Sequence, residues 1–137
     1  MLMKNWDQKK IGSAIARGLL TAVFLVAAGM KLAALPFEVA GFERFGYPLG
    51  FMYVIGALQL IGAVMLWSRR FIGLGAMLLA VLMVGAAGCH LHAGDPIMMT
   101  LPALVLFIML AGLAYAFRSE LLALAPRFLL GRRLADY

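Results

Sequence analysis

The chain contains four long apolar segments, at about residues 11–35, 48–67, 71–91 and 97–117, and these constrain its fold more than any other feature. Each has about the 20 residues that an α-helix needs to cross a hydrocarbon core of about 30 Å. None alternates apolar and polar residues as a membrane-spanning β-strand does. The sequence therefore predicts an all-α fold, a bundle of four transmembrane helices in an integral membrane protein.

The composition also indicates lipid as the surrounding solvent. Of the 137 residues, 65% are hydrophobic and 13% are charged, whereas about 25% of the residues in a soluble domain are charged. The net charge of +6 does not indicate a nucleic-acid-binding protein, because the basic residues flank the apolar segments instead of clustering with aromatic ones. Anionic lipid headgroups account for this charge. We therefore expect the lipid bilayer as a partner and no nucleic acid.

The basic residues predict the orientation of the bundle. Ten of the 12 lie on one side of the four predicted spans: Lys4, Lys9, Lys10, Arg17, Arg69, Arg70, Arg118, Arg127, Arg132 and Arg133. Only Lys31 and Arg44 lie on the other side. Because basic residues concentrate in cytoplasmic loops, we expect both termini to be cytoplasmic, in a cell inner membrane or plasma membrane. A cleaved secretory signal is not expected, since Lys31 interrupts the region where cleavage would occur.

Two stretches lie outside the predicted spans. We expect residues 1–117 to form a single membrane domain and residues 118–137 a cytoplasmic amphipathic tail, in which leucines and basic residues recur at helical spacing. The outer loop at residues 36–47 mixes aromatic and charged residues. It could lie at the membrane interface as a turn of helix anchored by its aromatic rings.

Polar residues inside the predicted spans are candidates for function, because they are costly in lipid. Gln59 lies near the middle of the second segment and is expected to face other helices, either as a bond between helices or as a ligand contact. In the first segment, a helical stripe runs from Arg17 through Phe24 to Lys31. We expect Arg17 to extend to the headgroups rather than face the bundle. For Lys31 both alternatives stay open.

Small residues recur on the second and third segments. They are Gly56, Gly62, Gly73, Ala76 and Ala80. Small side chains let transmembrane helices approach closely, so we expect these residues to serve packing rather than chemistry.

Residues 88–96, GCHLHAGDP, hold the chain's one cysteine and both histidines. We interpret this stretch as the end of the third helix and the turn into the fourth. Gly94 suits a left-handed conformation, and Pro96 can begin a helix. Asp95 is then as well placed to cap the fourth helix as to bind a ligand.

The same stretch does not form a complete site in itself. A single cysteine excludes an internal disulfide and a CxxC pair. No metal site is expected, because several ligands would have to converge from one helix end. Cys89 and His92 share a helical face that His90 does not, so we expect His92 rather than His90 to face the interior.

The predicted topology gathers ionisable residues at the outer mouth of the bundle, above Gln59. The expected ligand-binding residues are Lys31, Glu38, Glu43, Gln59, Cys89, His92 and Asp95. Ionisable groups above an apolar interior suit an amphipathic ligand with one polar end, such as a quinone or a lipid. The alternative is a solvated rim with weak salt bridges. No catalytic residue can be named, and no metal, flavin or nicotinamide cofactor is expected.

Several short motifs, taken in order, resemble the DoxX-like membrane proteins. They are AAGMKL, FGYP, YVIGALQLIGAVMLW and HLHAGDP, within about residues 15–115. The resemblance implies a four-helix membrane bundle. It also implies a link to membrane redox systems, such as thiosulfate:quinone oxidoreductase in archaea, or to assembly chaperones, as in distant animal relatives. Many members have a glutamate where this chain has Gln59, so a proton-transferring carboxylate is not expected there. Lys31 matches a lysine of the family, which favours an inward-facing side chain.

We therefore expect a subunit or accessory protein of a membrane redox system, with a quinone as ligand and an amphipathic-ligand pocket near its outer mouth. Expected partners are membrane redox proteins or a second copy of the chain. The alternative is a non-catalytic scaffold or assembly chaperone that acts through helix–helix contacts. Whether the chain is itself an enzyme stays open, because no complete redox motif is present.

Overall fold

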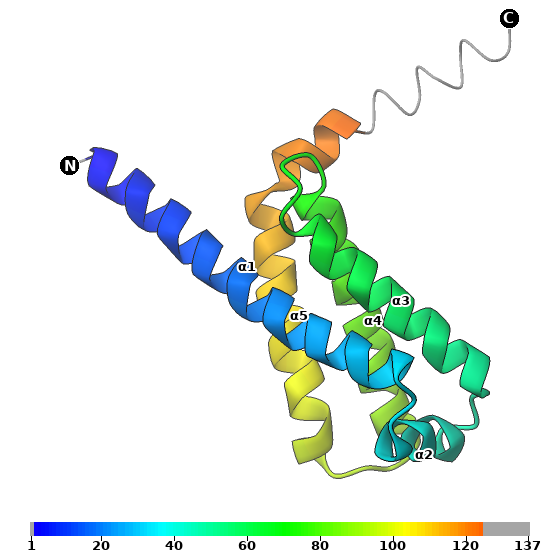
Figure 1. Cartoon of the computed structure of the whole chain (residues 1–137). Helices are drawn as coiled ribbons and strands as arrows, with labels where there is room; N and C mark the ends of the chain where they lie inside the picture. Colours follow the sequence, from blue (N-terminus) through cyan, green and yellow to red (C-terminus); the bar gives the residue numbers. More distant parts are fainter. Residues whose placement is uncertain (1, 125–137) are drawn as a thin grey trace, which may run out of the picture.

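The computed structural model describes residues 2–124, and all its regular elements in that range are helices. They are α1 (Leu2–Leu32), α2 (Pro36–Arg44), α3 (Leu49–Met65), α4 (Ile72–His92) and α5 (Ile97–Ala116). Figure 1 shows the four longer helices in a bundle, with the short α2 lying across one end. The start of α1 and the end of α5 lie at the opposite end. We call these the α2 end and the terminal end. The predicted all-α fold is confirmed.

Three helical segments are long and apolar enough to cross a membrane: Asp7–Leu32 within α1, α4 and α5. The helix α3 has 17 residues, about the shortest length that spans a bilayer. It passes the same test only together with α2, from which it is bent by 113°. The structure therefore contains three to four candidate spans, which agrees with a multi-pass membrane protein. The predicted count of four requires α3 to be a span.

The long helices pack in chain order, α1 against α3, α3 against α4 and α4 against α5. Small residues allow this packing. A Cβ added at Gly62 would lie 2.6 Å from Leu79, and one added at Gly75 would lie 2.7 Å from Met65 Cβ. Since lipid tails provide no hydrophobic drive between helices, such close approach is the main source of contact energy. The expected packing role of the small residues is confirmed.

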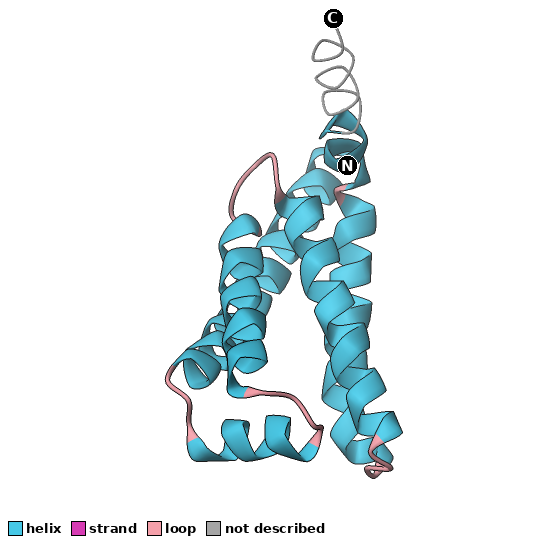
Figure 2. Ribbon diagram, turned by 90° about the vertical axis from the view of Figure 1, so that its right-hand side faces the viewer, coloured by secondary structure: helices cyan, strands magenta, loops and turns pink. Residues whose placement is uncertain are grey.

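The helix α2 lies across the end of the bundle in Figure 2. The chain turns into it through Ala34, whose φ of 51° is unusual for a residue with a side chain. Pro36 then occupies the first turn, where its missing N–H costs nothing. None of the residues of α2 is fully buried. The turn of helix expected in this loop is thus a helix of nine residues.

Arg17 contacts the connection between α3 and α4 at the terminal end, and the expectation that it extends to the headgroups stays a prediction. Its Nη1 donates to the carbonyl oxygen of Leu66 at 3.3 Å. Its guanidinium carbon lies 4.8 Å from the ring centroid of Trp67, and Trp67 Nε1 donates to Thr21 Oγ1 at 2.7 Å. Leu66 is the C-cap of α3, and the partial negative charge at a helix C-terminus favours a cation there.

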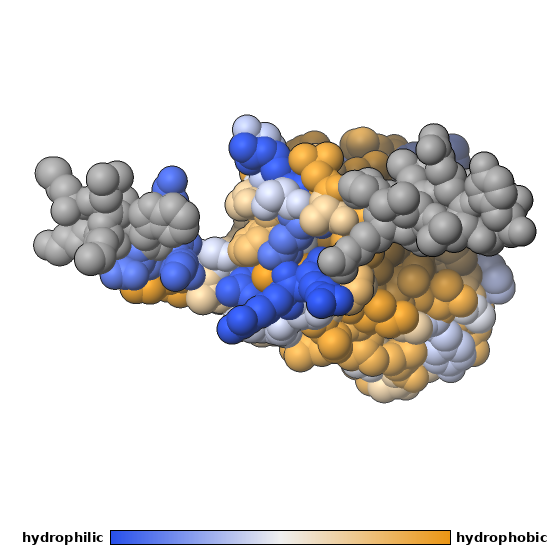
Figure 3. Space-filling model, turned by 90° about the horizontal axis from the view of Figure 1, so that it is seen from above, coloured by the Kyte–Doolittle hydropathy of each residue, from blue (hydrophilic) through white to orange (hydrophobic). Residues whose placement is uncertain are grey.

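The predicted tail lies largely outside the described residues. Residues 118–124 are helical, and the amphipathic pattern beyond residue 124 falls on positions that the structure does not describe. The division between a membrane domain and a tail stays a prediction. Figure 3 looks onto the terminal end, where hydrophilic residues gather, while the visible sides of the bundle are mostly hydrophobic.

Candidate functional site

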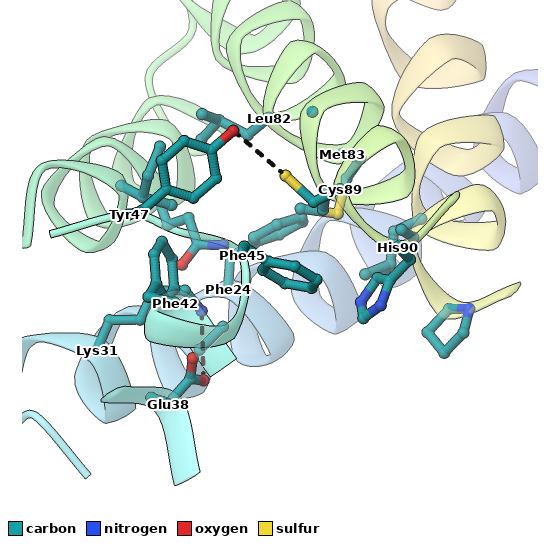
Figure 4. A pocket seen from close by; sticks show the side chains of 18 of the residues that line it. Phe24, Lys31, Glu38, Phe42, Phe45, Tyr47, Leu82, Met83, Cys89 and His90 are labelled. Atoms are coloured by element: carbon teal, nitrogen blue, oxygen red, sulfur yellow. Dashed lines mark hydrogen bonds and ion pairs between the residues drawn. The ribbon is translucent and has the colours of Figure 1, made fainter. Parts of the chain in front are cut away.

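A cavity of about 430 Å³ lies between the helices at the α2 end. All five helices contribute to its wall, and most lining side chains are apolar. On α3 the lining runs from Phe51 inward to Gln59, a distance of about 12 Å along the helix axis. The cavity is therefore a deep, mostly apolar slot beneath α2. Figure 4 shows its mouth.

An ion pair between α1 and α2 forms one side of this mouth. Lys31 Nζ donates to Glu38 Oε1 at 3.3 Å, and the two side chains are only 12% and 14% exposed. Lys31 lies in the last turn of α1 and Glu38 in the first turn of α2. Both charges are therefore favourable next to their own helix dipoles. The sharp turn through Ala34 brings the two helix ends together.

Gln59 lines the inner part of the cavity and is 4% exposed. Its Oε1 is buried and has no hydrogen-bond partner among the described residues. A buried acceptor without a partner destabilises the folded state, typically by about 1–3 kcal/mol. The prediction that Gln59 faces the interior is confirmed, but no bond to another helix is found in the described part of the chain.

Aromatic rings form a second side of the mouth. Tyr47 stacks on Phe51 with ring centroids 4.6 Å apart, and Phe42 lies 6.2 Å from Phe51. The Cys89 thiol donates to the Tyr47 hydroxyl at 3.8 Å, as drawn in Figure 4. This bond with Cys89 raises the pKa of Tyr47 above its ordinary value of 10.0, so the phenol stays protonated. The mouth thus offers flat apolar faces beside a few hydrogen-bonding groups.

A charged network fixes the other end of α2. Arg44 donates to both Asp95 oxygens, at 2.5 and 2.7 Å, and His90 Nδ1 lies 2.7 Å from Asp95 Oδ2. The hydrogen bond from Arg44, followed by that from His90, holds the pKa of Asp95 well below its usual value of 3.8. The same bond raises the pKa of Arg44. The ring of His90 also packs edge-on against Phe45, with centroids 5.3 Å apart.

Four of the seven predicted ligand-binding residues line this cavity. They are Lys31, Glu38, Gln59 and Cys89. Asp95 belongs to the charged network and is not among the lining residues. Nor does it cap α5, which begins after Pro96 without a side-chain cap. Glu43 is exposed on α2 and does not line the cavity. That any of them binds a ligand stays a prediction.

The expected orientation of the two histidines is reversed. His90 is half-buried and lines the cavity, whereas His92 is exposed. The spacing along α4 separates the two side chains, and of the two it is His90 that contacts Asp95 and Phe45. The turn at Gly94, with φ of 72° as expected, carries Asp95 back towards His90.

A second hollow, also of about 430 Å³, adjoins the first and includes His92. Phe45, Tyr47, Gly85 and Cys89 line both. Within residues 2–124 no three His, Cys, Asp or Glu side chains are placed to hold a metal ion. The site therefore combines mostly apolar walls with a few polar groups, among them the Cys89 thiol.

The chain is similar to known proteins of one family. Residues 15–112 match the model of the DoxX-like family. The uncharacterized protein YdgD of Bacillus subtilis (strain 168) is 35% identical over 93 residues, which cover 64% of this chain and 82% of that protein. No solved structure matches the chain.

Proposed function

The chain belongs to the DoxX-like family, and on that premise we propose that it binds a quinone or a similar amphipathic lipid in the cavity beneath α2. In this role it is a subunit or accessory protein of a membrane redox system. The protein holds the ligand, and a partner or a second copy of the chain supplies the redox chemistry. The proposed role of this chain is to bind the ligand.

The observation that carries this proposal is the mostly apolar cavity with Gln59 in its inner wall, a side chain whose buried Oε1 has no hydrogen-bond partner among the described residues. Cavities that bind small molecules combine mostly apolar walls with a few polar groups that orient the ligand. Here the walls suit a ring and a chain, while Gln59, Lys31 and Glu38 provide polar groups at two depths. The volume of about 430 Å³ lies within the usual range for such sites.

The proposed orientation places the α2 end on the outer side of a cell inner membrane or plasma membrane. Within the described residues, Lys9, Lys10, Arg69, Arg70 and Arg118 are exposed towards the terminal end. This clustering of basic residues supports a cytoplasmic terminal end. The cavity then opens near the outer leaflet, where quinones and lipids can reach it.

The proposal is tested by thermal unfolding of the purified protein in detergent with a short-chain ubiquinone or menaquinone. A ligand specific for the folded state raises the midpoint, by about 2.7 kcal/mol of stability at 100 times its Kd. Lys31→Met and Gln59→Leu should weaken this effect, whereas His92→Ala, outside the cavity, should retain it. An unchanged midpoint at saturating quinone would exclude the proposed function.

The alternative is a scaffold or assembly chaperone. It is favoured by one feature of α4: a Cβ added at Gly85 or Gly88 would have no neighbouring atom within 4 Å. Such small residues leave room for a helix of a partner. Under this alternative, Gly88→Leu abolishes copurification of a partner protein, whereas Gln59→Leu does not. Retention of the partner protein in Gly88→Leu and its loss in Gln59→Leu would favour the ligand-binding role.

A further inference from the structure

The second hollow, beside the cavity, is lined by polar side chains that can all donate a hydrogen bond. Its volume is about 430 Å³, and it lies between the connection from α2 to α3 and the last turns of α4. The polar side chains in its wall are those of Arg44, Tyr47, Cys89 and His92. Each of these side-chain types carries a donor, and none of the described residues that line the hollow is a carboxylate. The wall therefore suits a group that accepts hydrogen bonds.

Arg44 presents its guanidinium to this hollow in a fixed position. Two of its N–H groups bond to Asp95, and its guanidinium carbon lies 4.9 Å from the ring centroid of Phe45. The Arg44 side chain is 48% exposed, whereas that of Asp95 is 7% exposed and does not line the hollow. The ion pair therefore exposes its cation and covers its anion. A guanidinium has further N–H donors, and one that is already held in place loses little entropy when it bonds to an anion.

An exposed stripe of α4 leads from this hollow towards the middle of the helix. Its residues share one helical face and are all exposed: Val81, Gly85, Gly88 and His92. A Cβ added at Gly85 or Gly88 would have no neighbouring atom within 4 Å. The two glycines thus leave open space between the side chains of Val81 and His92. We call this stripe the α4 furrow.

The length of α4 places the hollow and the α4 furrow at different depths in a bilayer. This candidate span has 21 residues, so it is about 31 Å long, close to the hydrocarbon thickness of about 30 Å. His92, its last residue, then lies at the headgroup layer, and Val81, near its middle, lies among the lipid tails. An amphipathic molecule along α4 therefore meets donors at its polar end and open apolar space along its chain.

We propose that this surface binds an anionic phospholipid, with the phosphate in the second hollow and one acyl chain in the α4 furrow. The charged oxygens of a phosphate accept hydrogen bonds, and the arginine fork matches their geometry. A free phosphate would occupy the hollow alone, whereas a phospholipid occupies both parts. A zwitterionic lipid adds an ammonium group, for which the described wall of the hollow provides no carboxylate. This site is separate from the proposed quinone site, and its failure would leave that proposal standing.

Lipid binding to the full chain, purified in detergent, tests the inference. The probes are phosphatidylglycerol and phosphatidylcholine with identical acyl chains. Each is titrated while the midpoint of thermal unfolding is followed, because a ligand of the folded state raises it. We expect phosphatidylglycerol to bind about tenfold more tightly, the effect of one hydrogen bond to a charged group. Inorganic phosphate at the concentration that saturates phosphatidylglycerol binding should leave the midpoint unchanged, since it has no chain to lie along α4.

Arg44→Met should abolish the preference for phosphatidylglycerol, and Arg69→Met is the matched control. Arg69 is an exposed arginine in the connection between α3 and α4, at the terminal end. The control removes the same charge far from the hollow and should keep the tenfold ratio.

Two further variants do not disturb the Arg44–Asp95 pair. His92 is exposed, so His92→Ala should retain the fold, and it should lower the affinity for phosphatidylglycerol about threefold through the loss of one donor. Gly88→Leu fills the α4 furrow and should weaken the binding of both lipids. Thermal unfolding of each variant without lipid verifies that the fold is retained.

Four results would overturn the inference. They are equal affinity for the two lipids, a preference that persists in Arg44→Met, an equal loss of preference in Arg69→Met, and an unchanged affinity in His92→Ala. A midpoint shift with inorganic phosphate as large as that with phosphatidylglycerol would overturn the assignment to a lipid. Unchanged lipid affinity in Gly88→Leu, with loss of a copurified partner protein, would overturn the place of the acyl chain and assign the α4 furrow to a partner helix.

Discussion

The glycines of α4 have opposite surroundings at the two ends of the bundle. At the terminal end, Gly73 and Gly75 of α4 lie against neighbouring helices, with no room for a side chain. At the α2 end of the same helix, Gly85 and Gly88 face open space. One end is therefore filled by backbone contact, and the other is hollow beneath a covering helix. The comparison teaches that small residues specify close packing only where a neighbouring helix reaches them.

The two ends also differ in how their carboxylates are paired with cations. At the terminal end, Arg17 lies against the ring of Trp67, and Glu120 has a buried Oε2 without a hydrogen-bond partner among the described residues. At the α2 end, Glu38 and Asp95 are each paired with a cation. An ionised carboxylate stabilises the fold where a cation is bonded to it. It destabilises the fold where it is buried without such a bond.

Adding one methyl group to α4 at each end should give the largest contrast. In Gly75→Ala the new Cβ would lie 2.7 Å from Met65 Cβ and 3.0 Å from the Gly62 carbonyl oxygen. Because α4 must then shift away from α3, we expect a loss of about 1–3 kcal/mol of unfolding free energy. Gly88→Ala should gain up to about 1 kcal/mol through helix propensity. Denaturation by detergent titration measures both, and equal losses would refute the comparison.

A larger side chain at each end tests whether the hollow is truly available. Ala76 is fully buried in the core, so Ala76→Leu should cost about 1–3 kcal/mol through overpacking. Ala86 lines the cavity, so Ala86→Leu should leave stability unchanged or raise it by up to about 1 kcal/mol. The same variant should weaken quinone binding, since it occupies ligand space. Thermal unfolding with and without quinone reports both effects, and intact binding would contradict the assigned cavity.

Removing one member of the pair at the mouth should cost less. Lys31→Met leaves the Glu38 carboxylate, only 14% exposed, without its cation, and we expect a loss of about 1–2 kcal/mol, below the cost for a fully buried pair. The double variant Lys31→Met/Glu38→Met should recover most of this loss. A double variant as unstable as the sum of both single variants would show that the pair does not act as a unit.

The two carboxyl groups should show opposite dependence on pH, with the smallest effects. The pKa of Asp95 is lowered from 3.8 by Arg44. Ionised Asp95 therefore stabilises the fold above pH 3.8, and this contribution is lost as pH falls towards the folded-state pKa. Burial raises the pKa of Glu120 above 4.5, and Arg17 opposes this only in part. Ionisation of Glu120 therefore disfavours the fold as pH rises through that range.

Substitutions at Asp95 and Glu120 test whether the two carboxylates have opposite effects on stability. At pH 7, Asp95→Asn should lower the midpoint of thermal unfolding and Glu120→Gln should raise it. Both differences should shrink when the measurement is repeated near pH 3.5. Shifts in the same direction at pH 7 would mean that the two ends do not differ in how they hold a carboxylate.

Two of the long helices could be predicted closely from the sequence, whereas α1 (Leu2–Leu32) begins well before the predicted segment 11–35. The helices α4 and α5 begin and end within one residue of the predicted segments 71–91 and 97–117. Lipid imposes this accuracy, because a span needs a fixed apolar length. The inward orientation of Gln59 followed from the same physics, since an amide is costly against lipid. These features depend on one segment and its solvent, so no knowledge of the neighbouring helices was needed.

The parts that depend on neighbouring helices could not be predicted. The pair Arg44–Asp95 joins residues 51 positions apart, and nothing in the local sequence indicates it. The direction that each histidine faces depends on how α4 packs against α3 and α5, and His90 rather than His92 lines the cavity. Arg17 likewise bonds to Leu66, 49 positions along the chain, and the helical stripe of the first segment does not indicate this contact. Helical spacing gives the angle between two side chains but not the direction of either.

We expect the attachment of α2 to make access to the cavity sensitive to the ionic strength of the surrounding solution. This helix buries no residue completely and is tied down by Glu38 near its start and Arg44 at its end. The Arg44 side chain is 48% exposed, so dissolved ions screen its attraction to Asp95, while the contacts between the long helices are unaffected. Salt concentration should therefore change how fast a ligand enters and leaves, with little effect on how firmly the bundle holds together.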